Sequence, residues 1–116
     1  MDPVIAAIRT ELTEHADPAI RESSQRFFKE AITCHGMKTA AVMAIAKKHW
    51  KEIRSREKEE IFLLCEELYR YGYLEEAFIA AKWAEFLSDR FEERDISVFE
   101  RWIDTWITNW AACDGF

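Results

Sequence analysis

The chain has few of the residues that interrupt helices or cross-link a fold. Its 116 residues include three glycines and two prolines, and runs of β-branched residues are few, so the sequence gives almost no signal for strands. The three cysteines, Cys34, Cys65 and Cys113, are far apart and form no Cys-x-x-Cys pair. This pattern argues against both a disulfide framework and a zinc site. We therefore expect an all-α protein with reduced thiols.

Signals for a membrane or for a metal are also missing. No apolar run approaches the length that crosses a bilayer, and Asp2 and Pro3 stand where a signal peptide would carry basic residues. The histidines, His15, His35 and His49, have no partners at metal-ligand spacing. We expect a cytoplasmic protein without a metal or a cofactor, with its histidines at the surface or in loops.

Capping residues and apolar periodicity predict a series of helices. Asp2 and Asp17 each precede a proline, so each is a candidate N-cap for a helix with proline in its first turn. Ser55 is a candidate cap for a longer helix, and Gly72 stands where that helix would end. The predicted helices cover residues 3–15, 18–29, 38–50, 55–71 and 74–87, and a loop containing Gly36 covers residues 32–37.

A sixth helix is expected to start either at Asp95 or at Ser97, where Ser97 and Glu100 form a capping-box pattern. Because the connections are short, consecutive helices should be antiparallel neighbours. Six helices then form three hairpins of roughly forty residues, the length of HEAT-type repeats, stacked as an α-solenoid. A plain helical bundle is the alternative.

Four residues near the end of the chain, Trp102, Trp106, Trp110 and Asp114, follow one another at a spacing of four. On one helix they would form a single stripe, which is either part of the core or an aromatic wall that leads to an acid. Asn109 is a good N-cap, so it can end the sixth helix and start a seventh. Trp102 and Trp106 then belong to the core, whereas Trp110 and Asp114 lie together one turn apart on the next helix.

Charge is distributed unevenly along the chain. The net charge is −6, yet residues 26–56 contain eight basic and two acidic residues, which makes this stretch +6 and the remainder −12. A local basic zone inside an acidic protein is typical of a nucleic-acid footprint, although ordinary lysines on a helix surface would give the same pattern. The basic residues are Arg26, Lys29, Lys38, Lys47, Lys48, Lys51, Arg54 and Arg56.

Five segments together resemble the AlkD-type DNA alkylation repair glycosylases. Their order and distances cover nearly the whole chain, although no single segment is specific. They are Arg-Phe-Phe-Lys-Glu at 26–30, His-Gly-Met-Lys-Thr at 35–39, Ile-Ala-Lys-Lys at 45–48, Cys-Glu-Glu-Leu-Tyr at 65–69 and Asn-Trp-Ala-Ala-Cys-Asp at 109–114.

The resemblance implies HEAT-like helical pairs curved around duplex DNA, and removal of N3- or N7-alkylated purines by hydrolysis of the N-glycosidic bond. The catalytic acid of this family follows a tryptophan by four residues at the start of a helix, which matches Trp110 and Asp114. Lys38 and Thr39 align with the DNA-facing loop, and Phe27 aligns with an aromatic residue that faces the same groove. The expected partner is double-stranded DNA that contains alkylated bases.

The residue types suit this chemistry. An alkylated purine is already a cationic leaving group, so the reaction mainly needs stabilisation of the developing positive charge on the sugar, which the carboxylate of Asp114 would supply. The indole of Trp110 would hold a cationic base or sugar by cation–π attraction worth about 0.5–2 kcal/mol. Lys47, Lys48 and Lys51 would add attraction for the phosphates.

Compared with the family, the chain is about half the expected length. A second tryptophan wall and an arginine for the backbone phosphate would lie beyond Phe116, so we expect an N-terminal half whose exposed apolar edge favours a homodimer. The enzyme would then be the full-length protein. The rival interpretation is a HEAT-like protein interaction module without catalysis, which would place no demand on Trp110 and Asp114.

Overall fold

The computed structural model describes residues 2–27 and 34–105, and every regular element in these ranges is helical. The expected all-α class is confirmed there. The elements are α1 (Pro3–Glu14), α2 (Pro18–Phe27), α3 (Thr39–Ile53), α4 (Lys58–Arg70), α5 (Leu74–Phe86), the short 3₁₀ helices η1 (Ser88–Arg90) and η2 (Glu93–Asp95), and α6 (Ile96–Thr105). Within the described ranges, no helix has both the length and the apolar character to cross a membrane.

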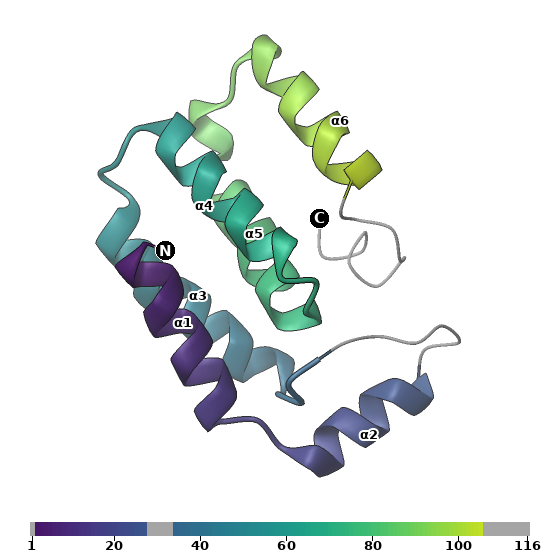
Figure 1. Cartoon of the computed structure of the whole chain (residues 1–116). Coiled ribbons are helices and arrows are strands. Elements are labelled where there is room, and N and C mark those ends of the chain that lie inside the picture. Colours follow the sequence, from purple (N-terminus) through teal and green to yellow (C-terminus); the bar gives the residue numbers. More distant parts are fainter. Residues whose placement is uncertain (1, 28–33, 106–116) are drawn as a thin grey trace.

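The helices form two layers. Figure 1 shows α1 and α4 side by side in one layer, with α3 and α5 in the layer behind them, and each of these neighbours is in contact. The antiparallel pairs are α1 with α3 and α4 with α5, while α2 leads away from α1 instead of packing along it (Figure 1). Pairing therefore skips α2, so the prediction that the first two helices form an antiparallel hairpin is wrong. Stacked antiparallel pairs of this kind are consistent with a HEAT-like solenoid.

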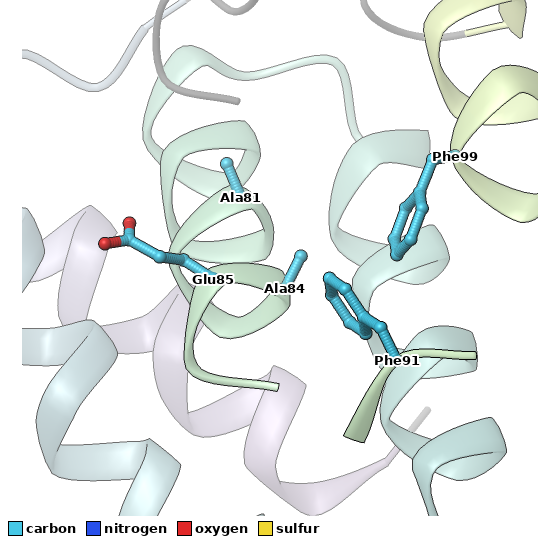
Figure 2. Close-up of a pocket in the computed structure, with 5 residues that line it drawn as sticks. All are labelled: Ala81, Ala84, Glu85, Phe91 and Phe99. Atoms are coloured by element: carbon cyan, nitrogen blue, oxygen red, sulfur yellow. The ribbon is translucent and has the colours of Figure 1, made fainter. Parts of the chain in front are cut away.

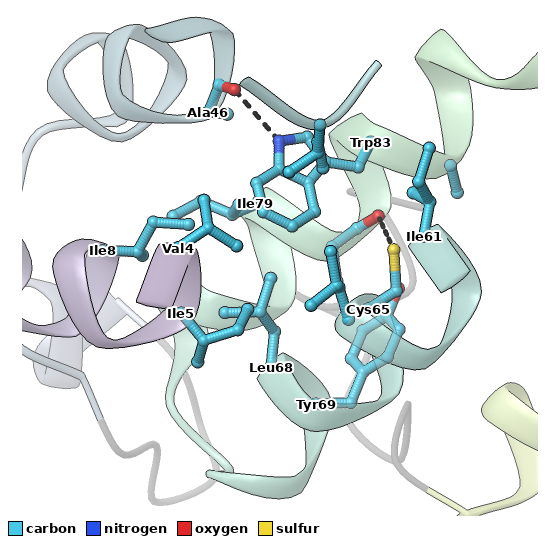
Figure 3. Close-up of a cluster of buried hydrophobic side chains, with 14 of the residues drawn as sticks. Val4, Ile5, Ile8, Ala46, Ile61, Cys65, Leu68, Tyr69, Ile79 and Trp83 are labelled. Atoms are coloured by element: carbon cyan, nitrogen blue, oxygen red, sulfur yellow. Dashed lines mark hydrogen bonds between the residues drawn. The ribbon is translucent and has the colours of Figure 1, made fainter. Parts of the chain in front are cut away.

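The core lies between the two layers and is centred on α5. This helix is apolar on most of its circumference because α3 packs on one side of it and α4 on the other. Trp83 is fully buried and its Nε1 donates a 3.0 Å hydrogen bond to the carbonyl oxygen of Ala46 in α3 (Figure 3). On the other side, the Sγ of Cys65 in α4 lies 3.6 Å from the carbonyl oxygen of Ala80. α5 therefore joins the two helical pairs into one core.

The first helix closes this core with an apolar stripe. Val4, Ile5, Ile8 and Leu12 recur at helical spacing and are all buried (Figure 3). Burial of an aliphatic side chain of this size stabilises the fold by about 1.5–3 kcal/mol. Asp2 caps the helix as predicted, accepting a 3.0 Å hydrogen bond from the backbone N–H of Val4.

Tertiary contacts move the start of α4 away from the predicted cap. Ser55 was expected to cap this helix, but the helix begins at Lys58 after an N-cap at Glu57. Lys58 is buried and its Nζ lies 2.9 Å from Asp95 and 3.1 Å from Glu92, so an ion pair with a distant segment sets this boundary. The predicted stop is confirmed, because Gly72 follows the C-cap with φ +75°.

The last described helix is anchored to α4. Trp102 is fully buried, as its predicted core role requires, and its Nε1 donates to Glu66 at 3.0 Å. The predicted capping box at Ser97 is wrong, because Ser97 lies inside α6 and its hydroxyl donates to the carbonyl oxygen of Arg94. The box is formed instead by Glu92 and Asp95 around η2. Trp106 and the expected break at Asn109 lie outside the described residues.

Candidate nucleic-acid interface

The turn that leads into α3 is held by a carboxylate from α5. One oxygen of Glu75 accepts the backbone N–H of His35 at 2.9 Å, and the other accepts the N–H of Gly36 at 3.1 Å. Gly36 adopts φ +90°, and its carbonyl oxygen accepts the N–H of Asp17 at 2.8 Å. A Cβ atom at this position would lie 2.2 Å from the carbonyl oxygen of Asp17. Only glycine fits here, so the turn is fixed between the starts of α2 and α5.

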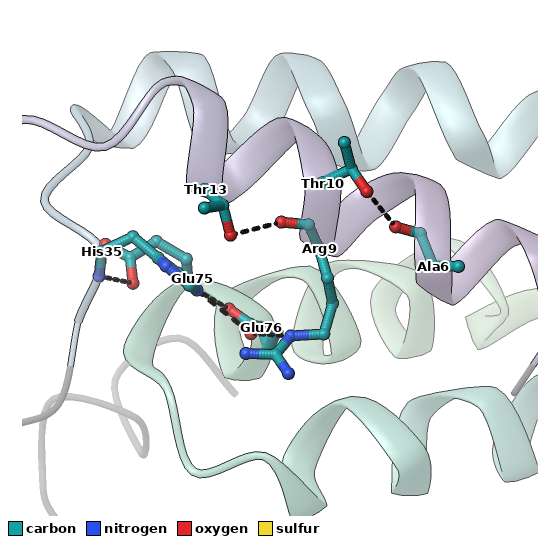
Figure 4. A network of polar contacts seen from close by, with 7 residues as sticks. All are labelled: Ala6, Arg9, Thr10, Thr13, His35, Glu75 and Glu76. Carbon is teal, nitrogen blue, oxygen red and sulfur yellow. Dashed lines mark hydrogen bonds and ion pairs between the residues drawn. The ribbon is translucent and has the colours of Figure 1, made fainter.

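A second carboxylate holds the side chain of the same turn. Glu76 is fully buried, and its two oxygens lie 3.0 and 3.2 Å from Nε2 of His35 (Figure 4). Nε of Arg9 in α1 donates to the same carboxylate at 3.0 Å. The His35 ring stacks on Tyr73 with 4.2 Å between centroids, and the Arg9 guanidinium carbon lies 3.8 Å from the centroid of the Tyr71 ring. We call His35, Glu75, Glu76 and Arg9 the latch cluster.

The latch cluster presents the two turn residues that the resemblance assigns to DNA. Lys38 is the N-cap of α3 in an extended conformation, and Thr39 is the first residue of the helix. Both are exposed. Lys38 makes no side-chain capping hydrogen bond, and a cation at a helix N-terminus is disfavoured by the helix dipole. An exposed residue that is unfavourable for the local helix, as Lys38 is here, is expected where function requires that residue.

The lysines of α3 differ in their surroundings. Lys47 and Lys51 are exposed and four residues apart, so they lie on one face of the helix. Lys48 forms an ion pair with Glu11 of α1, and this contact raises the pKa of Lys48 above its ordinary value. Likewise, Nη1 of Arg56 lies 2.9 Å from a carboxylate oxygen of Asp2 at the start of α1. The predicted basic zone is therefore partly neutralised by α1.

Four basic residues of this zone keep an unmatched charge. In the part of the chain that the structure describes, no ion pair involves Lys38, Lys47, Lys51 or Arg54. Lys47, Lys51 and Arg54 are four and three residues apart, so they lie on one face of α3. Lys38 lies in the turn before the helix. The exposed positive charge is therefore divided between the turn and one face of α3.

His49 contradicts the expectation that the histidines lie at the surface or in loops, whereas His35 lies in the turn before α3, as expected. His49 is buried in α3, where Nε2 lies 2.7 Å from Glu11 and Nδ1 lies 3.2 Å from Glu52. Both ring nitrogens of His49 therefore face carboxylate oxygens. His35 likewise has acidic neighbours, separated from it by about forty residues of sequence. Sequence analysis missed these contacts because the partners come from other helices; the only available signal was the acid pair Glu75-Glu76 in an apolar segment.

Three donor side chains of the latch cluster come close enough to bind a cation. One ligand atom from each of His35, Glu75 and Glu76 lies within 4.8 Å of the others. The carboxylates, however, already accept hydrogen bonds from Arg9 and from two backbone amides. Both carboxylates are therefore satisfied by hydrogen bonds from the protein itself.

The structure does not describe the side chains of the other predicted site residues. Trp110 and Asp114 lie outside the described residues. Phe27 ends α2, but its side chain also lies outside the description. The structure therefore brings Lys38, Thr39 and the α3 lysines onto one helix and its leading turn.

Comparison with known protein families identifies the chain. A family model described as DNA alkylation repair enzyme matches residues 8–116. The chain belongs to this family. Neither curated proteins nor solved structures gave a match. The family places the chain in DNA alkylation repair.

Proposed function

We propose that the chain binds duplex DNA containing alkylated bases through the turn at Lys38–Thr39 and the exposed cations of α3. In the full-length protein, Trp110 and Asp114 would act in hydrolysis of the N-glycosidic bond of N3- or N7-alkylated purines. The observation that carries the proposal is the position of Lys38, an exposed cation at the start of a helix, on a turn that Glu75 and Gly36 fix.

The start of α3 suits a phosphate group. The first backbone N–H groups of a helix have no acceptor within the helix, and the helix dipole favours an anion there. α3 is 15 residues long, and no side chain caps it. A phosphate oxygen would satisfy these N–H groups and would also remove the cost of placing Lys38 beside them. The hydroxyl of Thr39 would add a further donor.

The exposed face of α3 suits a backbone longer than one phosphate. Lys47 and Lys51 lie beyond the turn on the solvent side of the helix, and neither has an acidic partner in the described part of the chain. Each lysine that neutralises a phosphate releases counterions, so the affinity should fall steeply with salt. Contacts of this kind position a duplex without reading its sequence.

The chemical step rests on the family resemblance of two residues. The alkylated purine is cationic while it is attached and departs as a neutral base with the electron pair of the N-glycosidic bond, so the positive charge passes to the sugar. The carboxylate of Asp114 would stabilise that charge and orient the water molecule that adds to the sugar. The indole face of Trp110, four residues earlier, would hold the cationic base or sugar. Neither role requires a metal or a redox cofactor.

Release of N7-methylguanine from methylated duplex DNA tests this proposal. The assay uses the longest form of the protein that its gene encodes. We expect Asp114→Asn to slow release by at least about a hundredfold. Asp104→Asn, on the exposed side of α6, is the matched control and should release base normally. Equal release by Asp114→Asn and the unmodified protein would remove Asp114 from the mechanism.

A second candidate function, a protein interaction module, is favoured by one observation. An apolar hollow of about 140 Å³ is lined by Ala81, Ala84, Phe91 and Phe99, with Glu85 also part of the lining (Figure 2). Phe91 is 37% exposed. The hollow is smaller than typical ligand pockets of about 300–1,000 Å³, so it suits an apolar side chain of a partner better than a ligand. Duplex binding without base release by the full-length protein would support this alternative.

A further inference from the structure

The latch cluster contains two buried negative charges and one permanent positive charge. Glu75 is 3% exposed and Glu76 is fully buried, whereas only the Arg9 guanidinium faces them as a permanent cation. Burial of an unmatched charge is costly, and a buried carboxylate needs a cation or several hydrogen bonds. A proton on His35 would supply a second positive charge at 3.0 Å from Glu76. With both carboxyl groups ionised, the cluster has zero net charge only while His35 carries that proton.

The other groups that face His35 do not change this balance. Tyr73 stacks on the imidazole ring, and Tyr71 lies under the Arg9 guanidinium, so both contribute aromatic faces that favour cations. Cys34 precedes His35 and is buried; burial and the nearby Glu75 raise the pKa of its thiol, which keeps it neutral. Arg21 of α2 approaches Gly36, but it is exposed and its charge is screened by water.

His35 is linked directly to the turn that presents Lys38. Its own backbone N–H and the next one, of Gly36, donate to Glu75, while its ring contacts Glu76. Loss of the ring proton therefore leaves two adjacent carboxylates to share one guanidinium. Their repulsion acts on the hydrogen bonds that fix the turn, only three residues before Lys38.

We propose that protonation of His35 regulates DNA binding, so that the affinity for duplex DNA falls as the pH rises through the titration of this histidine. The inference rests on the proposed DNA-binding function. Histidine is the side chain whose charge ordinarily changes between about pH 5 and 8. If DNA binds more tightly to the protein with protonated His35 than to the protein with neutral His35, then bound DNA must also raise the proton affinity of the latch cluster.

Binding of a fluorescein-labelled undamaged duplex at low salt tests the proposal by fluorescence anisotropy at about pH 6 and pH 8. We expect the unmodified protein to bind at least about fivefold more tightly at the lower pH. His35→Gln should bind at both pH values as weakly as the unmodified protein does at the higher one. Glu76→Gln removes the unmatched charge, so it should bind equally and tightly at both. His15→Gln, at the exposed C-cap of α1, should keep the full pH response.

A pH titration without DNA tests the latch cluster independently of DNA binding. In the unmodified protein, NMR should show the backbone amide of Gly36 shifting together with the ring of His35 as the pH changes. Addition of Zn²⁺ at constant pH should leave that amide unchanged; a shift on addition would assign the cluster to a metal and overturn the proposal. Equal affinity at both pH values would also overturn it and leave the DNA-binding function standing, whereas no binding at either pH would overturn the proposed function itself.

Discussion

The carboxylate of Glu75 accepts a 3.1 Å hydrogen bond from the backbone N–H of Gly36, although 39 residues separate them in the chain. Glu75 belongs to the first turn of α5, and Gly36 belongs to the turn before α3. Because α5 is the central helix of the core, this contact ties the turn before α3 to the core. The placement of Lys38 is thus determined by the core.

Substitution of the turn glycine should be far more costly than substitution of the other described glycine with positive φ. Gly36→Ala combines a disfavoured φ of +90° with a Cβ 2.2 Å from the carbonyl oxygen of Asp17, and we expect a loss of about 2–4 kcal/mol in the free energy of unfolding. Gly72→Ala is the matched control, with φ +75° and open space around the added Cβ, and should lose about 1 kcal/mol. Urea unfolding measures both, and equal losses would contradict the close packing at Gly36.

Removal of the buried indole hydrogen bond should loosen the joint between the two helical pairs. Trp83→Phe deletes the donor to the carbonyl oxygen of Ala46 and leaves a cavity, so we expect a loss of about 2–4 kcal/mol. Trp50→Phe, at a half-buried position packed against Phe86, is the control and should lose about half as much or less. Thermal unfolding followed by circular dichroism compares them, and a smaller loss at Trp83 would refute its central role.

The acid stability of the protein should depend on Glu11. Burial raises the pKa of this carboxyl, but hydrogen bonds from Lys48 and His49 outweigh burial and hold it below its ordinary value of 4.5. A carboxyl with a lowered folded-state pKa stabilises the fold above its unfolded pKa, and that contribution is lost as the pH falls through the folded value. Glu11→Gln should therefore lower the free energy of unfolding by about 1 kcal/mol at neutral pH.

The difference between Glu11→Gln and the unmodified protein should shrink toward zero as the pH falls through the lowered folded-state pKa of Glu11, because both proteins then carry a neutral side chain at this position. Urea unfolding at a series of pH values measures this convergence. Glu14→Gln, an exposed position on the same helix, should match the unmodified protein throughout. A difference that stays constant with pH would show that Glu11 acts by packing and not by charge.

The lysines of α3 should contribute unequally to duplex binding. Lys47→Gln and Lys51→Gln remove charges without acidic partners in the described part of the chain, so each should reduce the salt dependence of the affinity by about one counterion. Lys48→Gln removes a charge that Glu11 already balances, and it should change the slope by less. Lys82→Gln, paired with Glu85 on α5, is the control. Equal changes in this slope for Lys47→Gln and Lys48→Gln would contradict the conclusion that α1 partly neutralises the basic zone.

Local signals in the sequence predicted several boundaries well. Asp2 caps α1, Asp17 accepts the N–H of Ala19 at 2.9 Å, and Gly72 ends α4, because each depends on residues only two to four positions away. Trp102 was expected in the core for the same reason, since apolar spacing along one helix indicates the buried face.

Contacts between distant segments could not be predicted in this way. Ser55 has the right chemistry for a cap, yet the ion pair of Lys58 with Asp95 sets the start of α4 instead. His49 has no acidic partner on its own helix except Glu52, and its burial follows from α1 packing over it. The latch cluster joins three separate segments in the same manner. The loop around Gly36 was therefore predicted from the sequence, but the acids that hold it were not.

The salt dependence of duplex binding by Lys38→Gln tests the central claim most directly. If the turn held by Glu75 presents Lys38 to a phosphate, the variant should bind more weakly, and the slope of log affinity against log salt should fall by about 0.9 relative to the unmodified protein. An unchanged affinity and slope, with the fold intact by circular dichroism, would contradict the account.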